Sequence, residues 1–181
     1  AKINADGGGY GAFIIPRRCK SFIQCRPEIN KIGMHSSDTS AVTFNGVELG
    51  ADAKMEGDGR RSTYKVLNDS RVSISALACG LLRSALSEAV AYAKVRETFD
   101  RPIAEYQGVS FPLADASAKL SASWALVEKA ALAADEGTLS QKLSSETKLM
   151  ATQSAYEGCL AASDVFGGLS YMMDSRVAQD F

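Results

Sequence analysis

Arg96, Thr98 and Phe99 lie within four positions of one another and are suited to binding a phosphorylated ligand that carries a flat ring. The planar guanidinium of an arginine matches phosphate oxygens. The hydroxyl of Thr98 can add a hydrogen bond, Phe99 can cover a ring, and Gln107 follows after a short loop. Together these residues could hold a dinucleotide cofactor. Their spacing alone favours a simpler role, in which Arg96 and Arg101 offset the dipole at the end of a helix.

Two further segments have residue types that suit binding. Gly167 and Gly168 follow Phe166 and have no Cβ, so a ligand can approach their backbone closely. The local pattern favours a helix end followed by a turn at this pair. Asn68, Asp69, Ser70 and Arg71 form a polar run inside an apolar helical segment. Four consecutive residues cover every side of a helix, so some of them must face a neighbour or a wet cavity, unless the whole stretch is solvated.

Several classes of site are excluded by composition. His35 is the single histidine and stands in a polar loop, so neither a nucleophilic triad nor a metal site can be assembled around it. The four cysteines form no C-x-x-C pair and are expected to be free thiols. A net charge of −1 predicts no nucleic-acid partner. No apolar run approaches the ~18–20 residues that span a bilayer. The chain does not begin with Met, and we expect an incomplete start.

The elements that position these residues change in character near residue 58. Residues 1–58 are predicted to be β-structure, with a short strand at 11–16 and a tight hairpin at Asn45-Gly46 between 41–44 and 47–49. From residue 59 the apolar period becomes helical. Three helices are predicted, over residues 60–96, from Ser110 to 135 with Pro112 in the first turn, and over 140–165. Gly137 is the expected end of the second helix.

These elements predict an α+β chain with two domains. An antiparallel, barrel-like β segment covers residues 1–58, and a helical domain of the four-helix-bundle type covers residues 59–181. The expected apolar side of the first helix includes Leu67, Ile74, Leu77 and Leu81, and that of the third includes Leu149 and Leu160. Many alanines permit close helix packing. They fit either an ordinary core or a face shared with another subunit.

The order of the motifs resembles that of the acyl-CoA dehydrogenase family. The resemblance covers essentially all 181 residues, and its specificity comes from the order and spacing of motifs that are individually weak. Residues 31–39 resemble the family's Gly-x-x-x-Ser-Asp-Thr segment, and residues 42–47 the hairpin that follows it. The remaining similar segments are 67–71, 92–99, 102–103, Gln107, Phe111, 113–115 and 165–168.

The resemblance implies an FAD-dependent enzyme that oxidises an acyl-CoA thioester to the trans-2-enoyl-CoA and passes electrons to an electron-transfer flavoprotein. It implies that Arg96, Thr98, Phe99, Gln107, Gly167 and Gly168 contact the FAD of a neighbouring subunit in a homodimer or homotetramer. Asn68, Asp69, Ser70 and Arg71 would line the acyl-CoA pocket. The implied compartment is the mitochondrial matrix in a eukaryote or the cytoplasm in a bacterium.

Two departures from the family pattern keep other functions open. The family usually has Gly where this chain has Asp100, whose carboxylate repels a pyrophosphate unless Arg101 offsets it. The family's catalytic glutamate stands either at the position of Ser70, which cannot act as the base, or in a Tyr-Glu-Gly motif beyond Phe181. Glu157 has matching neighbours but precedes the glycine pair. We therefore expect no catalytic residue and no activity within these residues alone. A non-catalytic scaffold subunit and an acyl-CoA oxidase remain the alternatives.

Overall fold

The computed structural model describes residues 2–3, 9–16, 23–25, 30–31, 33–172 and 174. The chain divides into two compact units, residues 1–64 and residues 65–181. Helix α1, Gly59–Val95, crosses this division. It begins at the first residue of the predicted helical domain, but its first turns belong to the N-terminal unit.

The N-terminal unit contains short antiparallel strand pairs. Strand β1 (Lys2–Ile3) pairs with β2 (Gly9–Tyr10), and β3 (Ile23–Cys25) pairs with β4 (Val42–Phe44). A 3-10 turn, η2, covers Ala51–Ala53. Within the described part of the chain every sheet has two strands and none closes on itself. The antiparallel sheet is therefore confirmed, whereas the barrel-like arrangement is not supported.

The hairpin predicted at Asn45-Gly46 is wrong. Strand β4 pairs with β3, with Ile23 opposite Phe44, and not with the residues that follow the turn. Gly46 has φ +61°, but Asn45 has no positive φ, and the tight two-residue hairpin of this type needs both. Residues 11–16 are instead tied to the segment before α1. The amide of Ile14 donates to the carbonyl of Ala53 (2.8 Å) and that of Met55 to Ala12 (2.9 Å).

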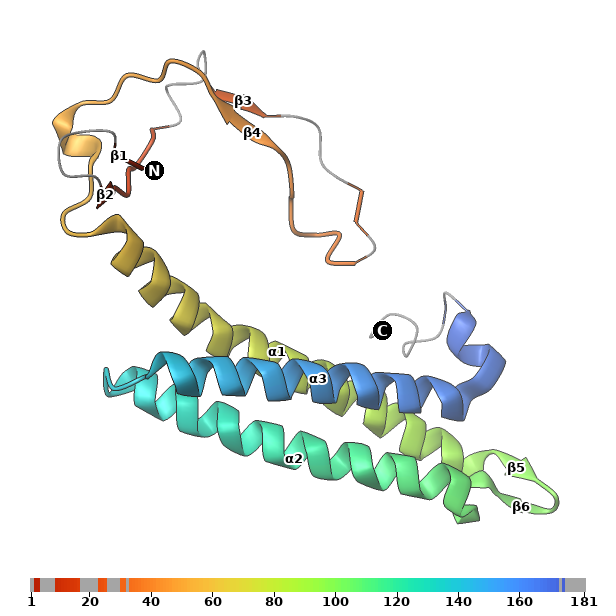
Figure 1. Ribbon diagram of the computed structural model, residues 1–181. Coiled ribbons are helices and arrows are strands. Elements are labelled where there is room, and N and C mark those ends of the chain that lie inside the picture. Colours follow the sequence, from red (N-terminus) through yellow and green to blue (C-terminus); the bar gives the residue numbers. More distant parts are fainter. Residues whose placement is uncertain are drawn as a thin grey trace. The chain divides into compact units, whose positions relative to one another are not determined.

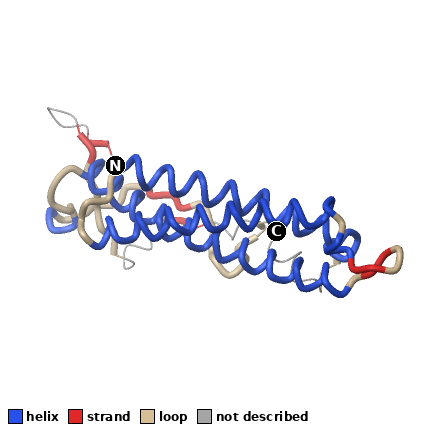
Figure 2. The backbone as a smooth tube through the Cα atoms, turned by 90° about the horizontal axis from the view of Figure 1, so that it is seen from below, coloured by secondary structure: helices blue, strands red, loops and turns tan. Residues whose placement is uncertain are grey.

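The C-terminal unit consists of helices that run alongside one another with alternating direction (Figures 1 and 2). Helix α1 is followed by the hairpin β5 (Glu97–Thr98) and β6 (Arg101–Pro102), the turn η3 (Ile103–Glu105), α2 (Gln107–Asp135), α3 (Gln141–Phe166) and η4 (Gly167–Tyr171). The three predicted helices are therefore present, as antiparallel neighbours joined by short connections.

The helix ends follow local chemistry. Ser140 accepts a hydrogen bond from the amide of Leu143 (3.1 Å) and caps α3. Gly137 has φ +70° and ends α2, as predicted. Helix α2 begins at Gln107, earlier than the predicted Ser110, because the amides of Val109 and Ser110 already donate to the carbonyl of Tyr106. Pro112 therefore lies inside the helix and not in its first turn.

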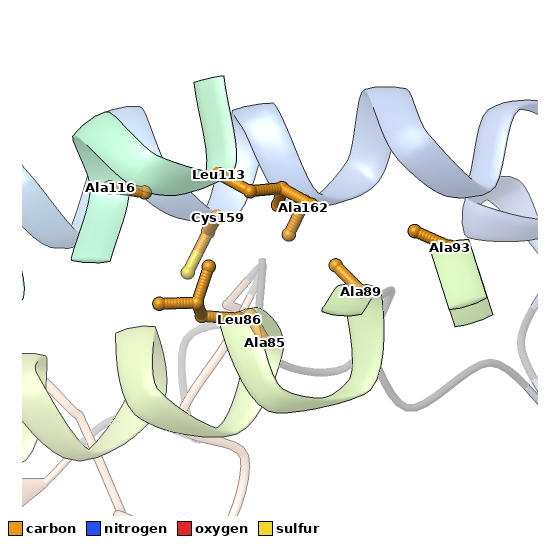
Figure 3. Close-up of a cluster of buried hydrophobic side chains, with 8 residues drawn as sticks. All are labelled: Ala85, Leu86, Ala89, Ala93, Leu113, Ala116, Cys159 and Ala162. Carbon is orange, nitrogen blue, oxygen red and sulfur yellow. The ribbon is translucent and has the colours of Figure 1, made fainter. Parts of the chain in front are cut away.

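Small side chains dominate the core. One cluster joins Ala85, Leu86, Ala89 and Ala93 of α1 to Leu113 and Ala116 of α2 and to Cys159 and Ala162 of α3 (Figure 3). The second cluster joins Ala78, Cys79 and Leu82 to Val127, Ala151 and Ala155. Cys79 is a free thiol, as expected, and both Cys79 and Cys159 are buried. Burial raises the pKa of the Cys79 thiol.

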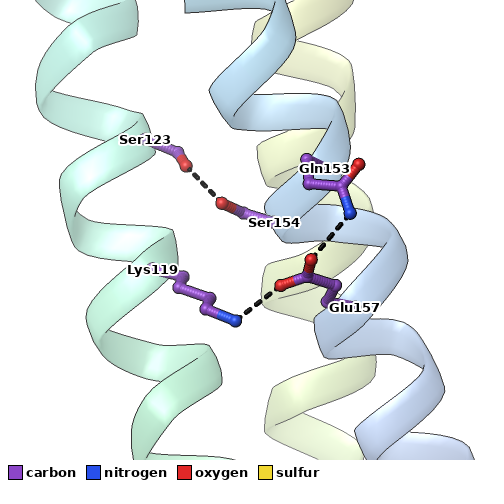
Figure 4. A network of polar contacts seen from close by, with 5 residues as sticks. All are labelled: Lys119, Ser123, Gln153, Ser154 and Glu157. Carbon is purple, nitrogen blue, oxygen red and sulfur yellow. Dashed lines mark hydrogen bonds and ion pairs between the residues drawn. The ribbon is translucent and has the colours of Figure 1, made fainter.

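Part of the predicted apolar side is wrong. Leu67, Ile74 and Leu77 are each 46% exposed, and Leu149 of α3 is 67% exposed. The buried faces carry hydroxyl-bearing and small residues instead, among them Ser75 of α1 and Ser144 and Thr147 of α3. These hydroxyl groups can be buried because each one has an oxygen atom as its hydrogen-bond partner. Ser75 Oγ donates to the carbonyl of Arg71 (2.6 Å), and Ser123 and Ser154 bond across the α2–α3 contact (3.1 Å, Figure 4).

Helix α1 also contains an 18-residue window with mean hydropathy 1.4, enough by length and composition to cross a membrane. Within this structure 39% of that window is buried, and Leu82, Ala85 and Ala89 pack against the other helices. Buried core helices meet the same criterion, so this single helix is weak evidence for a membrane span.

Candidate functional site

The end of α1 and the end of α3 lie together. The ring of Tyr92 stacks on that of Phe166, with 4.6 Å between the centroids and 19° between the planes. Arg96 follows Tyr92 by one helical turn, and Gly167 follows Phe166 directly. The stack therefore brings the arginine segment and the glycine pair, which are distant in the sequence, to the same end of the helical unit.

A tight hairpin projects from this end. Thr98 pairs with Arg101, and Phe99 and Asp100 between them have φ values of +50° and +62°. Two consecutive positive φ values define the two-residue turn that matches the twist of a hairpin. The amide of Ile103 donates to the carbonyl of Arg96 (2.8 Å) and closes the base of the hairpin. Phe99 at the tip is 93% exposed. The sequence analysis placed the end of the first helix at residue 96 but did not predict this hairpin.

Tyr106 fixes one edge of this hairpin, and the sequence analysis did not identify it. Its hydroxyl donates to the carbonyl of Thr98 (2.9 Å), and the guanidinium of Arg101 lies 3.9 Å from its ring centroid. Tyr106 raises the pKa of Arg101, chiefly through a side-chain hydrogen bond. Arg101 is thus engaged by Tyr106, and among the described residues it forms no ion pair with Asp100. No spacing rule links an arginine to a tyrosine five positions later in a hairpin, so the sequence carried no signal for this contact.

Arg96 is exposed, and within the described ranges its side chain has no hydrogen bond or ion pair. Gln107 is also exposed and begins α2 directly after Tyr106. These side chains are therefore available to a ligand at this end of the unit.

Gly167 and Gly168 combine the two features considered in the sequence analysis, which are a helix end and a backbone that a ligand can approach closely. Gly167 ends α3 with φ +55° and ψ −131°, and its amide donates to the carbonyls of Ser163 and Asp164. A Cβ on either glycine would meet no atom within 4 Å. The pair is a helix end with open space beside its backbone. The positive φ explains why Gly167 suits this position.

The polar run on α1 faces two ways. Asn68 and Arg71 are half-buried and turn toward α3, whereas Asp69 and Ser70 are exposed. Arg71 Nη1 donates to Asn68 Oδ1 (2.8 Å) and to Ser145 Oγ (3.2 Å), and Ser144 Oγ lies 3.3 Å from Asn68 Oδ1. Ser70 Oγ donates to the carbonyl of Leu67 of its own helix (3.0 Å).

A polar cleft of about 330 Å³ opens beside this run. Its walls are Lys65, Asn68 and Asp69 of α1 and the end of α2 with the following turn, including Asp135, Gly137 and Leu139. Two of the four residues expected to line an acyl-CoA pocket therefore border a cleft.

Glu157 belongs neither to the residues near the Tyr92–Phe166 stack nor to the polar run on α1. Its carboxylate accepts from Lys119 Nζ of α2 (2.5 Å) and from Gln153 Nε2 (2.6 Å) on the face where α2 meets α3 (Figure 4). The bonds from Gln153 and Lys119 lower the pKa of Glu157, and the bond from Lys119 links α2 to α3. His35 is exposed, with its Nε2 3.0 Å from the carbonyl of Lys31. No group of three metal-ligating side chains occurs among the residues described.

Comparison with known proteins gives a consistent result. The profile of the acyl-CoA dehydrogenase C-terminal domain matches residues 57–181. An acyl-CoA dehydrogenase of Bacillus subtilis is 37% identical over 172 residues, which are 93% of this chain and 45% of that protein. The CarC subunit of the caffeyl-CoA reductase–Etf complex of Acetobacterium woodii is 29% identical over 93% of this chain and 45% of its own length.

Solved structures agree. Butyryl-CoA dehydrogenase from Megasphaera elsdenii superposes with a TM-score of 0.92 at 29% identity, covering 99% of this chain and 48% of that one. The chain thus spans about half the length of the proteins it resembles. From the profile match, the sequence relatives and the shared fold we conclude that this chain belongs to the acyl-CoA dehydrogenase family, a family of oxidoreductases.

Proposed function

We propose that the protein containing this chain is an FAD-dependent acyl-CoA dehydrogenase that converts an acyl-CoA to the trans-2-enoyl-CoA. The observation that carries the proposal is the arrangement around the Tyr92–Phe166 stack. It gathers a free arginine, an exposed aromatic ring and an open glycine pair at one end of the helical unit. These are the three features that the family resemblance assigns to FAD binding.

The residues at this end fit a dinucleotide. Arg96 can pair with a phosphate through a charge-assisted bond, and Thr98 and Gln107 can add hydrogen bonds. Phe99, exposed at the hairpin tip, can cover a flat ring, and Gly167 and Gly168 leave room for close approach of the ligand to their backbone. Bound FAD would supply the two-electron acceptor for the oxidation. The chain's own contribution is to bind and orient that group.

The acyl-CoA is proposed to lie against α1 at Asn68, Asp69, Ser70 and Arg71. Ser70 has a hydroxyl that cannot act as a base at neutral pH, so the proton from the α-carbon must go to a carboxylate elsewhere in the protein. We propose a glutamate beyond Phe181. Other parts of the whole protein are proposed to complete the site where the reaction takes place. Residues 1–181 alone are therefore expected to be inactive.

Two partners follow from the proposal. The exposed Phe99 suits a contact between subunits, which supports a homodimer or homotetramer in which one subunit completes the FAD site of another. The name of the Acetobacterium woodii relative includes an electron-transfer flavoprotein complex, and this supports such a flavoprotein as the electron acceptor.

The test is made with the whole protein. It should purify with flavin absorbance, and butyryl-CoA or a longer acyl-CoA should bleach that absorbance and reduce an electron-transfer flavoprotein. Arg96→Gln should weaken FAD binding about tenfold or more, because one charge-assisted bond contributes roughly 1.5–3 kcal/mol. Lys129→Gln, which removes an exposed charge from α2, should leave the FAD dissociation constant unchanged.

The alternatives predict different outcomes. A scaffold subunit, which Asp100 beside the hairpin tip would favour, should bind neither FAD nor acyl-CoA. An oxidase should consume oxygen and release peroxide with each acyl-CoA oxidised. A flavin-containing protein that is reduced by no acyl-CoA would contradict the dehydrogenase proposal.

A further inference from the structure

The hairpin of β5 and β6 has few supports of its own. Its ladder consists of two residue pairs, and the amide of Ile103 donates to the carbonyl of Arg96 (2.8 Å) at its base. Phe99 and Asp100 at the tip have φ values of +50° and +62°, a left-handed backbone that is unfavourable for a residue with a Cβ and most of all for a bulky one. The Phe99 side chain is 93% exposed, so packing against the described residues offsets little of this cost.

The side chain of Tyr106 contacts both strands of this hairpin. Its hydroxyl donates to the carbonyl of Thr98 (2.9 Å), the residue before the tip. Its ring faces the guanidinium of Arg101, the residue after the tip, at 3.9 Å from the ring centroid. Thr98 and Arg101 are the pair that closes the two-residue turn. The two contacts therefore hold the residues on either side of the unfavourable backbone.

The main chain of Tyr106 is fixed at the start of α2. Its amide donates to the carbonyl of Ile103 (3.1 Å), and its carbonyl accepts from two amides of the first turn of α2 (2.9 Å each). Gln107, the first residue of α2, follows directly. Tyr106 thus joins the strand that carries Thr98 to the helical turn that carries Gln107, and both of these residues are proposed to bind FAD.

We propose that Tyr106 is a positioning residue of the FAD site. It holds the hairpin in its left-handed turn and in a fixed position relative to α2, so that Thr98 and Gln107 meet the same cofactor. The inference rests on the proposed function, because it takes FAD as the ligand of these residues. It goes beyond that proposal by naming the residue that orders the hairpin before FAD binds, through the hydroxyl bond to Thr98 and the ring contact with Arg101.

The test uses the whole protein, with the FAD dissociation constant measured by flavin fluorescence. Tyr106→Phe keeps the ring beside Arg101 but removes the hydroxyl, which contributes about two- to tenfold to the equilibrium that orders the hairpin. FAD needs the ordered hairpin, so its dissociation constant should rise about two- to fivefold. Exchange of the Ile103 amide in the FAD-free protein should also accelerate, because the hairpin opens more often. Thermal unfolding checks that the variant remains folded.

A second variant separates positioning from a direct contact with FAD. Glycine at position 100 adopts the left-handed turn without the cost of a Cβ, so in Asp100→Gly the ordered hairpin depends less on Tyr106. The double variant Asp100→Gly/Tyr106→Phe should therefore bind FAD within about twofold of Asp100→Gly alone.

The matched control is Tyr64→Phe, near the start of α1. It removes the hydroxyl from another tyrosine that lies beside an arginine, since the guanidinium of Arg60 is 5.6 Å from the centroid of the Tyr64 ring. Neither residue belongs to the hairpin or to the start of α2. Tyr64→Phe should therefore change neither the FAD dissociation constant nor the exchange of the Ile103 amide.

The outcomes separate the two proposals. If the unmodified protein binds no FAD, the proposed function is wrong and this inference is overturned with it. If the unmodified protein binds FAD and folded Tyr106→Phe binds it equally well, the positioning role is wrong while the proposed function stands. If Tyr106→Phe weakens binding without faster exchange of the Ile103 amide, or weakens it equally in the Asp100→Gly background, the loss does not come from the hairpin and the positioning role is likewise wrong.

Discussion

Tyr92 of α1 and Phe166, the last residue of α3, stack with their ring centroids 4.6 Å apart. Each ring is half-buried, and each is followed within one helical turn by a residue proposed to contact FAD. The stack therefore couples the packing of two helices to the geometry of the proposed cofactor site.

Replacing Phe166 should affect stability and FAD binding together. Phe166→Leu removes the aromatic pair but keeps an apolar side chain, so the free energy of unfolding should fall by about 0.5–1.5 kcal/mol. FAD affinity should also fall, because Arg96 and Gly167 lose their common support. Denaturant titration and flavin fluorescence measure the two effects. Tyr171→Leu, at a ring that is 92% exposed, should change the stability little, and an equal loss in both variants would contradict this account.

Gly158 of α3 lies against Leu82 of α1 and Ala116 of α2 in the core. A Cβ at this position would overlap Cδ1 of Leu82, which is fully buried, and would lie 3.3 Å from Cβ of Ala116. Gly158→Ala should therefore destabilise the fold by about 1–3 kcal/mol, despite the better helix propensity of alanine. Gly80→Ala on α1 meets no atom within 4 Å and should stabilise by roughly 0.5–1 kcal/mol. Chemical denaturation that gave both variants the same sign would contradict the packing argument.

The Glu157 contacts predict a modest dependence of stability on acid pH. Hydrogen bonds from Gln153 and Lys119 lower the pKa of this carboxylate in the folded protein. A lowered pKa stabilises the fold above the unfolded pKa of about 4.3, and this contribution is lost as the pH falls through the folded value. Glu157→Gln should therefore be less stable than the unmodified protein near neutral pH, with the difference closing in acid.

The same pair behaves oppositely in base. Glu157 raises the pKa of Lys119, so the stability from the charged lysine is present below its unfolded pKa and is lost as the pH rises through the folded value. Because both groups are exposed, the effect should be small and reduced by added salt. Thermal unfolding at acid, neutral and alkaline pH, in low and high salt, would show whether the stability difference follows this profile.

Asp100 should tolerate glycine but not a branched side chain. Its φ of +62° is a conformation that glycine adopts freely, that aspartate tolerates and that β-branched residues avoid. Asp100→Gly should keep or strengthen the hairpin, and Asp100→Val should loosen it by about 1–2 kcal/mol. Hydrogen exchange of the Ile103 amide, which closes the hairpin base, measures this directly. Equal protection in both variants would show that the backbone conformation at Asp100 is not limiting.

Local sequence signals predicted the helical part of the fold well. The helical period and Gly137 at the end of α2 are properties of short segments, and they predicted all three helices, although α2 begins at Gln107 and not at Ser110. The order of the motifs was enough to recognise the family. These signals succeed because backbone hydrogen bonds within a helix and its caps involve only neighbouring residues.

Other features depended on contacts between distant segments. Leu67 and Leu149 continue apolar patterns yet are exposed, because the helices approach closely through alanine, serine and glycine. Strand β4 pairs with β3 and not with the residues after Asn45-Gly46. The amide of Asn68 was oriented by Arg71 and by serines of α3. The sequence by itself determined which segments become helices and to which family they belong. Only the tertiary structure decided which helix faces are buried and how the Asn68 side chain is bonded. Both depend on which residues of a distant segment lie opposite.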